Sequence, residues 1–216
     1  MVSPSNLSAL PDILLLRRLC QSLAMLDAIF SPEWNSRFYS FDSRWSEHSM
    51  IASMRNGSGD HFFVLFNASG AIIKGFAHES PMSPYQVQPP CIWPGVLDDV
   101  PAEFADFLAE PAFSLEETSF CCWRLYSQSS WHRGDIEFAN SENPDGSRDL
   151  LLMFEGNPRT YRDWATDYHE QPVDFKAVSL IYKYRPLSDD IMHTLNGDSS
   201  LSGLIKNAEE IGYPDL

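Results

Sequence analysis

The sequence predicts an α+β fold, in which an antiparallel sheet meander packs with an N-terminal helix and several short C-terminal helices. Four short segments rich in aromatic and branched residues follow one another with only tight polar or glycine turns between them, which is typical of hairpin-connected strands. A long stretch before them carries apolar residues at helical spacing. Beyond them, strand and helix patterns mix without the regular alternation of a doubly wound sheet.

The first element is an amphipathic helix within residues 7–30, whose apolar positions recur every three or four residues. Pro11 and Asp12 supply a start signal, and Ser31-Pro32 supplies an end. We expect this helix to cover one face of the sheet that follows. A helix that binds a partner is the alternative.

The sheet is predicted from four strands, and turns containing Asn56–Gly59 and Ser69-Gly70 supply the positive φ angles that tight reversals need. Nearly every residue of the third strand is apolar, which indicates a central strand covered on both sides. The predicted strands are residues 38–45, 50–55, 61–67 and 71–76.

A loop at residues 77–95 carries five prolines, a density that excludes helix and discourages strand pairing. It is the natural boundary between two halves, residues 1–95 and 96–216, which we expect to form one continuous globular unit. The second half is predicted to mix both element types. Its predicted strands are 118–126, 135–138, 149–155 and 177–184, with a turn at 143–146, and its predicted helices are 101–108, 161–170, 188–195 and 201–211.

The chain is strongly acidic, with 30 acidic and 15 basic residues among 216 and a net charge of −15. Six basic and eleven acidic residues lie in the first 108 positions, and nine and nineteen follow, so the charge is not confined to a tail. Such a surface repels phosphate backbones, which argues against nucleic acid as a partner. It would attract basic partners and speed their association, although acidity can also serve solubility alone.

The four cysteines lack metal-binding spacing, so the sequence predicts no structural zinc, and no cofactor is expected. Cysteines without a disulfide framework suit a reducing compartment. The N-terminal residues do not resemble a signal peptide, and no apolar run is long enough for a membrane span. We therefore expect a cytoplasmic protein, and the oligomeric state stays open.

His78 and Glu79, next to Ser80 at the end of a predicted strand, are the best local candidates for acid–base chemistry. If strand ends converge, two further pairs could join them in a metal site, namely Glu47-His48 and Asp60-His61, although no motif spacing demands it. The alternative is that these groups satisfy the backbone of their own turns.

Aromatic and acidic residues alternate in the second half and could form a docking surface for a basic protein, with the rings as anchors. The alternative is that the rings belong to the core and the acids are merely solvated. The candidate partner-binding residues are Trp131, Asp135, Glu137, Asp163, Trp164, Asp167, Tyr168 and Glu170.

Several stretches resemble a family of soluble bacterial proteins associated with toxin–immunity neighbourhoods. They are IKGFAHESP at 73–81, WPGVL at 93–97, EPAF at 110–113, the segment 161–168 with Trp164, and EIGYP at 210–214. The resemblance extends over most of the chain from Tyr39 onward. It implies a partner-binding role and brings no catalytic residue with it.

The leading hypothesis is therefore an acidic module that acts by binding, as an immunity-type inhibitor of a basic toxin does. The first alternative is a hydrolase-like enzyme that uses His78 and Glu79 beside the proline-rich loop. The second is a structural or assembly subunit.

Overall fold

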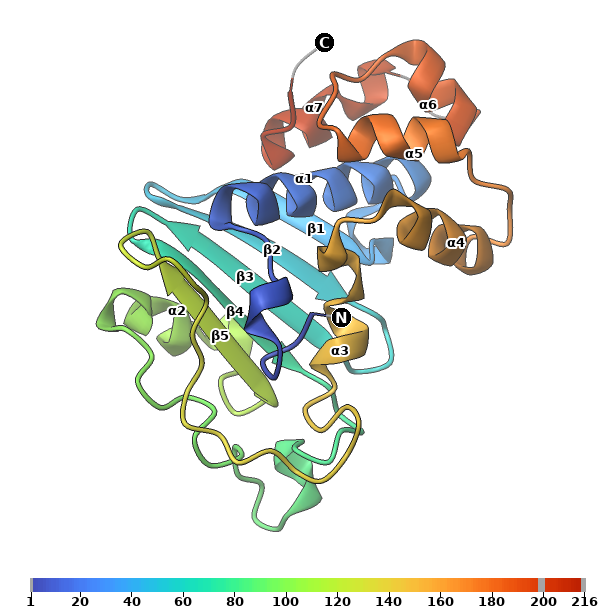
Figure 1. The fold of residues 1–216 in the computed structure, drawn as a ribbon. Coiled ribbons are helices and arrows are strands. Elements are labelled where there is room, and N and C mark those ends of the chain that lie inside the picture. The colour runs from blue at the N-terminus through green and yellow to red at the C-terminus, as the bar shows by residue number, and fades with distance from the viewer. Residues whose placement is uncertain (1, 198–200, 215–216) are drawn as a thin grey trace. The chain divides into compact units, whose positions relative to one another are not determined.

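The computed structural model describes residues 2–197 and 201–214 and has the predicted α+β architecture. A five-stranded antiparallel meander has the strand order β1-β2-β3-β4-β5 (Figure 1). The strands are β1 Tyr39–Ser46, β2 Ser49–Arg55, β3 His61–Asn67, β4 Gly70–Phe76 and β5 Phe120–Leu125. The helices are α1 Ile13–Phe30, α2 Ala105–Ala109, α3 Ser147–Leu150, α4 Pro158–Tyr168, α5 Phe175–Tyr182, α6 Asp189–Leu195 and α7 Leu201–Ile211.

The chain folds into two compact units, each built from segments far apart in the sequence. The first combines residues up to Ile13 with Ser53–Glu155, and the second combines Leu14–Ala52 with residues from Gly156 onward. The proline-rich loop at residues 77–95 lies within the first unit.

The first unit is centred on strands β3, β4 and β5, whose residues are almost all buried. Lys74 lies in the middle of β4, and its side chain is fully buried. Its ammonium group donates to the backbone carbonyls of Phe113, Ser114 and Glu117, at 2.9 Å for Ser114 and 2.8 Å for Glu117. Burial lowers the pKa of Lys74 to about 8. This buried cation fixes the loop that leads into β5.

The second unit gathers α5, α6 and α7 around α1 (Figure 1). Side chains of α1 bond to backbone carbonyls at the ends of these helices: Gln21 donates to Ile211 and Gly212, and Ser22 donates to Ile181. Most of α1 from Leu19 to Ile29 is buried. The C-terminal helices thus complete a core that the N-terminal helix begins.

Asp27 on α1 is a buried carboxylate in this core, with only 2% of its surface exposed. Its Oδ2 atom accepts from the backbone N–H groups of Phe38 (2.6 Å) and Tyr39 (2.7 Å), and the Tyr161 hydroxyl donates to Oδ1 at 3.4 Å. Burial raises the pKa of Asp27 to about 7, against the effect of these hydrogen bonds and of the Arg37 charge. Asp27 therefore anchors the start of β1 to α1 and α4.

The element boundaries confirm most of the prediction, including β3 to the residue. The predicted helix 7–30 is a 3₁₀ turn, Leu7–Ala9, followed by α1 from Ile13, directly after the Pro11-Asp12 start signal. The predicted helix 101–108 is likewise a 3₁₀ turn, Ala102–Phe104, continued by α2. The remaining 3₁₀ helices are Trp34–Ser36, Pro84–Gln86, Pro111–Phe113 and Leu152–Glu155.

The predicted strand at 177–184 is wrong, because residues 175–182 form α5. The Asp174 side chain accepts from the Ala177 N–H and caps the helix, and Ala177, Val178 and Ile181 bury one helical face. A short apolar stretch fits the periodicity of a helix and that of a strand equally well, so the capping residue favours the helix.

The predicted strand at 149–155 is also wrong: the segment consists of α3 and the 3₁₀ turn Leu152–Glu155. The predicted turn at 143–146 is present, with the Gly146 N–H donating to the Asn143 carbonyl, but it leads into a helix: the Asp145 side chain accepts from Ser147 and the Asn143 side chain accepts from the Arg148 N–H, in the first turn of α3.

The predicted strand at 135–138 is wrong as well, because the segment has no regular secondary structure. One isolated bridge joins Trp123 of β5 to His132, after which the chain leaves the sheet edge and packs against Gly95 through Gly134.

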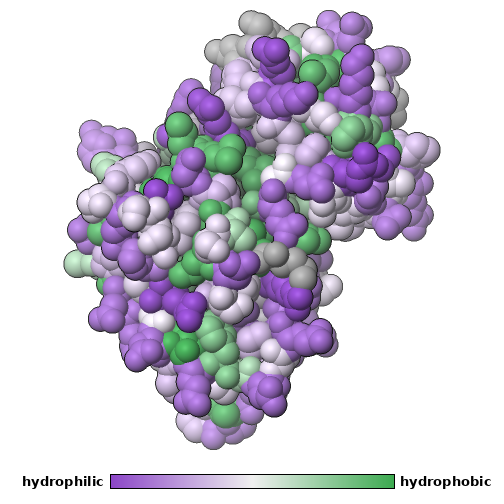
Figure 2. Space-filling model, viewed as in Figure 1, coloured by the Kyte–Doolittle hydropathy of each residue, from purple (hydrophilic) through white to green (hydrophobic). Residues whose placement is uncertain are grey.

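Hydrophilic residues cover most of the face seen in Figure 2, with smaller apolar patches between them. No helix among residues 2–197 and 201–214 is long and apolar enough to cross a membrane.

Candidate functional site

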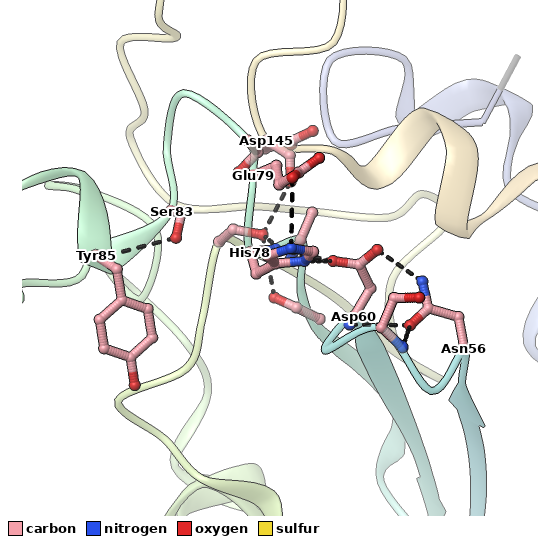
Figure 3. Close-up of polar contacts among 12 residues, drawn as sticks. Asn56, Asp60, His78, Glu79, Ser83, Tyr85 and Asp145 are labelled. Atoms are coloured by element: carbon pink, nitrogen blue, oxygen red, sulfur yellow. Dashed lines mark hydrogen bonds and ion pairs between the residues drawn. The ribbon is translucent and has the colours of Figure 1, made fainter.

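Two arrangements in the first unit bring chemically capable side chains together. The first is centred on His78, which follows β4 by two residues. Strands β3 and β4 pair antiparallel with His61 opposite Phe76, so Asp60 just before β3 and His78 just after β4 lie at the same end of this strand pair. The His78 Nδ1 atom lies 2.7 Å from Asp60 Oδ1, and the His78 backbone N–H donates to the same oxygen at 2.9 Å (Figure 3).

Asn56 holds the Asp60 carboxylate from the other side. Its Nδ2 group donates to Asp60 Oδ2 at 2.7 Å, while its own Oδ1 accepts from the N–H groups of Ser58 and Asp60. The turn between β2 and β3 therefore presents a carboxylate in a fixed orientation. The imidazole packs beside Gly59, where an added Cβ would come within 3.6 Å of the ring.

Electrostatics follow from this geometry. The hydrogen bond that the His78 imidazole donates to the Asp60 carboxylate raises the pKa of His78. Partial burial opposes ionisation of Asp60, but hydrogen bonds from His78 and Asn56 outweigh it and the pKa of Asp60 is lowered. The His78 Nε2 atom lies 3.7 Å from Glu79 Oε1, and the Glu79 side chain is 89% exposed. The structure thus pairs His78 mainly with Asp60, and Glu79 is a looser neighbour.

The other residues considered for a metal site do not join this pair. The His61 ring packs against Phe63 and Phe76, and burial lowers the pKa of His61. Glu47 and His48 are exposed in the turn at the opposite end of β2. Within the described part of the chain, no group of three or more His, Cys, Asp and Glu side chains is arranged to hold a metal ion.

The second arrangement is a groove with a volume of about 660 Å³, which we call the acidic groove. Its lining residues come from the end of the proline-rich loop, from Asp98 shortly after it, and from the segment that follows His132. They are Trp93, Pro94, Gly95, Asp98, Asp135, Glu137 and Phe138.

Two glycines allow these segments to meet backbone to backbone. A Cβ at Gly95, where φ is 86°, would lie 2.0 Å from the Asp135 carbonyl oxygen. A Cβ at Gly134 would lie 1.8 Å from the Gly95 carbonyl oxygen. Any larger residue would push the segments apart, so this contact holds together the two segments that line the acidic groove. The Trp93 indole N–H adds a hydrogen bond to the Glu137 carbonyl at 2.9 Å.

The acidic groove carries three carboxylates, and none of its lining residues is basic. Within residues 2–197 and 201–214, none of Asp98, Asp135 and Glu137 forms an ion pair. The nearby Arg133 guanidinium instead lies over the Phe138 ring, 5.0 Å from its centroid. The acidic groove therefore combines unpaired negative charge with two aromatic rings.

Two of the predicted partner-binding residues, Asp135 and Glu137, are exposed and line the acidic groove. Trp131 is buried instead, and its indole N–H donates to the Pro11 carbonyl at 2.8 Å, so it is a core residue. The sequence analysis missed Trp93, Asp98 and Phe138. Trp93 and Asp98 lie in or next to the proline-rich loop, where the sequence predicts a boundary and a neighbour of His78 and Glu79 but no partner-binding residue.

The other five predicted residues belong to the second unit, on or just after α4. Trp164 and Tyr168 stack with centroids 4.9 Å apart, and Phe38 packs against both rings. Asp163 forms an ion pair with Arg162, whereas Asp167 and Glu170 are exposed. The eight predicted residues are therefore divided between the two units.

Comparisons with known proteins add no assignment to either arrangement: no family model, no curated protein and no solved structure matches the chain.

Proposed function

We propose that the chain is a binding protein for a basic partner protein, with the acidic groove as its docking site. The observation that carries the proposal is the set of three unpaired carboxylates around a concave surface that also holds two aromatic rings. Carboxylates already paired within the chain would have to exchange partners on binding. Unpaired ones gain a counter-charge at once.

The groove offers the two contributions that protein interfaces combine. Aromatic side chains such as Trp93 and Phe138 supply most of the affinity at an interface when a partner covers them. The net charge of −15 supplies long-range attraction, which raises the rate of encounter with a cationic surface. In its finer form the proposal is that of an immunity-type inhibitor, which neutralises a basic toxin in the cytoplasm.

The test is to purify the tagged chain from the cells that produce it, identify each protein that co-purifies, and measure its binding separately. We expect a partner of net positive charge whose association rate falls as salt shortens the Debye length below about 10 Å. The double substitution D135N/E137Q should weaken binding. The control E103Q/D106N removes the same charges from exposed residues of the same unit outside the groove and should not. A partner that is acidic, or that binds at a salt-independent rate, would contradict the proposal.

A second candidate function rests on the 2.7 Å contact between His78 and Asp60. A carboxylate that holds one imidazole nitrogen leaves the other free to exchange protons, which is how acid–base residues are arranged in hydrolases. Assays with activated carboxylic and phosphoric esters test it, with H78N as the variant. Hydrolysis that is equal in wild type and H78N would dismiss this candidate.

A further inference from the structure

We infer that the acidic groove accepts an arginine side chain, so that a guanidinium group is the chemical feature by which the partner is recognised. The inference rests on the proposed function, since it specifies which cation of a basic partner enters the groove. Two features of the groove, the rings and the arrangement of the carboxylates, support a guanidinium over an ammonium, and a third, the state of the donors, supports a cation over an anionic or neutral ligand.

The rings come first. A guanidinium is planar and weakly hydrated, so it stacks on aromatic faces while its edge forms hydrogen bonds, whereas an ammonium is a compact and strongly hydrated charge. Trp93 and Phe138 both line the groove. Phe138 already carries one guanidinium of this chain, that of Arg133 at 5.0 Å from the ring centroid. The same pairing of chemistries is thus present at the edge of the site.

The carboxylates come second. Asp135 and Glu137 occupy alternate positions in the segment, and both are exposed, while Ile136 between them is partly buried. Both line the same groove as Asp98, which approaches from the loop. Several carboxylate oxygens around one space suit a group with five donors in a fixed fork, which can bond to more than one carboxylate at once.

The donors come third. The Trp93 indole N–H is committed to the Glu137 carbonyl, and none of the lining residues has a basic side chain. The groove therefore presents acceptors and ring faces to a ligand. An anionic ligand would meet three like charges there, and a neutral ligand would leave all three carboxylates uncompensated.

The experiment uses three short flexible peptides of Gly and Ser that differ only at two positions, which hold arginine, lysine or citrulline. Citrulline keeps the planar shape of arginine and has no charge. Each peptide is titrated into the full chain, and the indole N–H resonances of the tryptophans are followed by NMR, with W93F used to assign Trp93. We expect the Trp93 resonance to shift, with arginine binding about fivefold more tightly than lysine and citrulline binding most weakly.

The variant D135N/E137Q should reduce arginine-peptide affinity at least about tenfold, while E103Q/D106N should leave it nearly unchanged. Equal affinity for arginine and lysine would overturn the guanidinium inference and leave the proposed function standing. Binding without any Trp93 shift, or unaffected by D135N/E137Q, would overturn the groove as the site of recognition. If the basic partner protein itself is not found while the arginine peptide still binds at Trp93, the proposed function fails and the chemistry of the groove holds.

Discussion

Replacing Asp27 with asparagine tests whether a buried carboxylate destabilises the second unit once it is ionised. Burial raises the pKa of Asp27 to about 7, above its ordinary value of 3.8, so the folded protein holds this proton more tightly than the unfolded chain does. The resulting stabilisation is complete below the unfolded value and disappears as pH rises through the folded one. Asparagine keeps an oxygen for the Phe38 and Tyr39 N–H groups and carries no titrating proton.

The magnitude follows from the pKa values. At pH 5 Asp27 is protonated in the folded protein and ionised in the unfolded chain, and at pH 8 it is ionised in both. Over this interval the contribution of Asp27 to the free energy of unfolding therefore falls by about 2.5 kcal/mol. The free energy of unfolding of wild type minus that of D27N should therefore fall by about this amount over the interval. Titration of the other acids cancels to first order because both proteins contain them.

Urea unfolding at pH 5, 6, 7 and 8, followed by far-ultraviolet circular dichroism, measures this difference. Asp167→Asn, an exposed acid of the same unit, corrects for the loss of one negative charge. A difference between wild type and D27N that is the same at pH 5 and pH 8 would refute the reasoning. So would a difference that grows with pH.

Three further predictions concern residues of the first unit, with Gly156 of the second unit as a reference for one of them. Lys74→Met removes the ammonium group that donates to the carbonyls of Phe113, Ser114 and Glu117, so the free energy of unfolding should fall by about 2–3 kcal/mol in urea titrations. An unchanged midpoint would mean that the loop is held by other contacts. Asp60→Asn removes the charge that raises the pKa of His78, so the imidazole should titrate at lower pH in NMR spectra. Because the pKa of His78 is raised in the folded protein, the stability due to this pair is complete below about pH 6.5 and is lost as pH rises through the folded pKa. The free energy of unfolding of wild type minus that of Asp60→Asn should therefore fall between pH 5 and pH 8, and a constant difference would contradict this. Gly146→Ala should lower the free energy of unfolding by more than Gly156→Ala, which should lower it by about 1 kcal/mol. Both glycines have φ near +70°, but only at Gly146 would the new Cβ meet another atom closely, at 2.1 Å from the Ala77 Cβ. Equal losses in urea titrations would contradict this.

The meander was predictable because its turns carry their own chemistry. The glycines at 57 and 59 have positive φ angles, as the turn before β3 requires, and the strand patterns beside them are long and uninterrupted. The three strands predicted wrongly in the second half are short segments, and the one at 149–155 follows a turn whose Gly146 also has a positive φ angle, so a turn signal alone does not specify a strand. At 175–182 the Asp174 cap favours the helix. At 147–150 the side chains of Asn143 and Asp145 accept from N–H groups in the first turn of the helix.

The candidate site was predictable only in part. Asp60 and His78 were both noticed, but their contact depends on the pairing register of β3 with β4, which fixes the sheet edge at which they meet. Asp135 and Glu137 were predicted as partner-binding residues from composition. Their assembly with Trp93 depends on two backbones that touch at Gly95 and Gly134, and such a contact between distant segments leaves no periodic signal.

The chain passes between its two units at Ile13, at Ala52 and again at Glu155. Neither unit is a single continuous segment, so no one truncation point yields either of them intact. During synthesis on the ribosome, the amphipathic α1 emerges early, yet it lacks the segments that bury it until the residues beyond Gly156 have been translated. The core of the second unit is therefore completed only after the last segment of the chain has been translated.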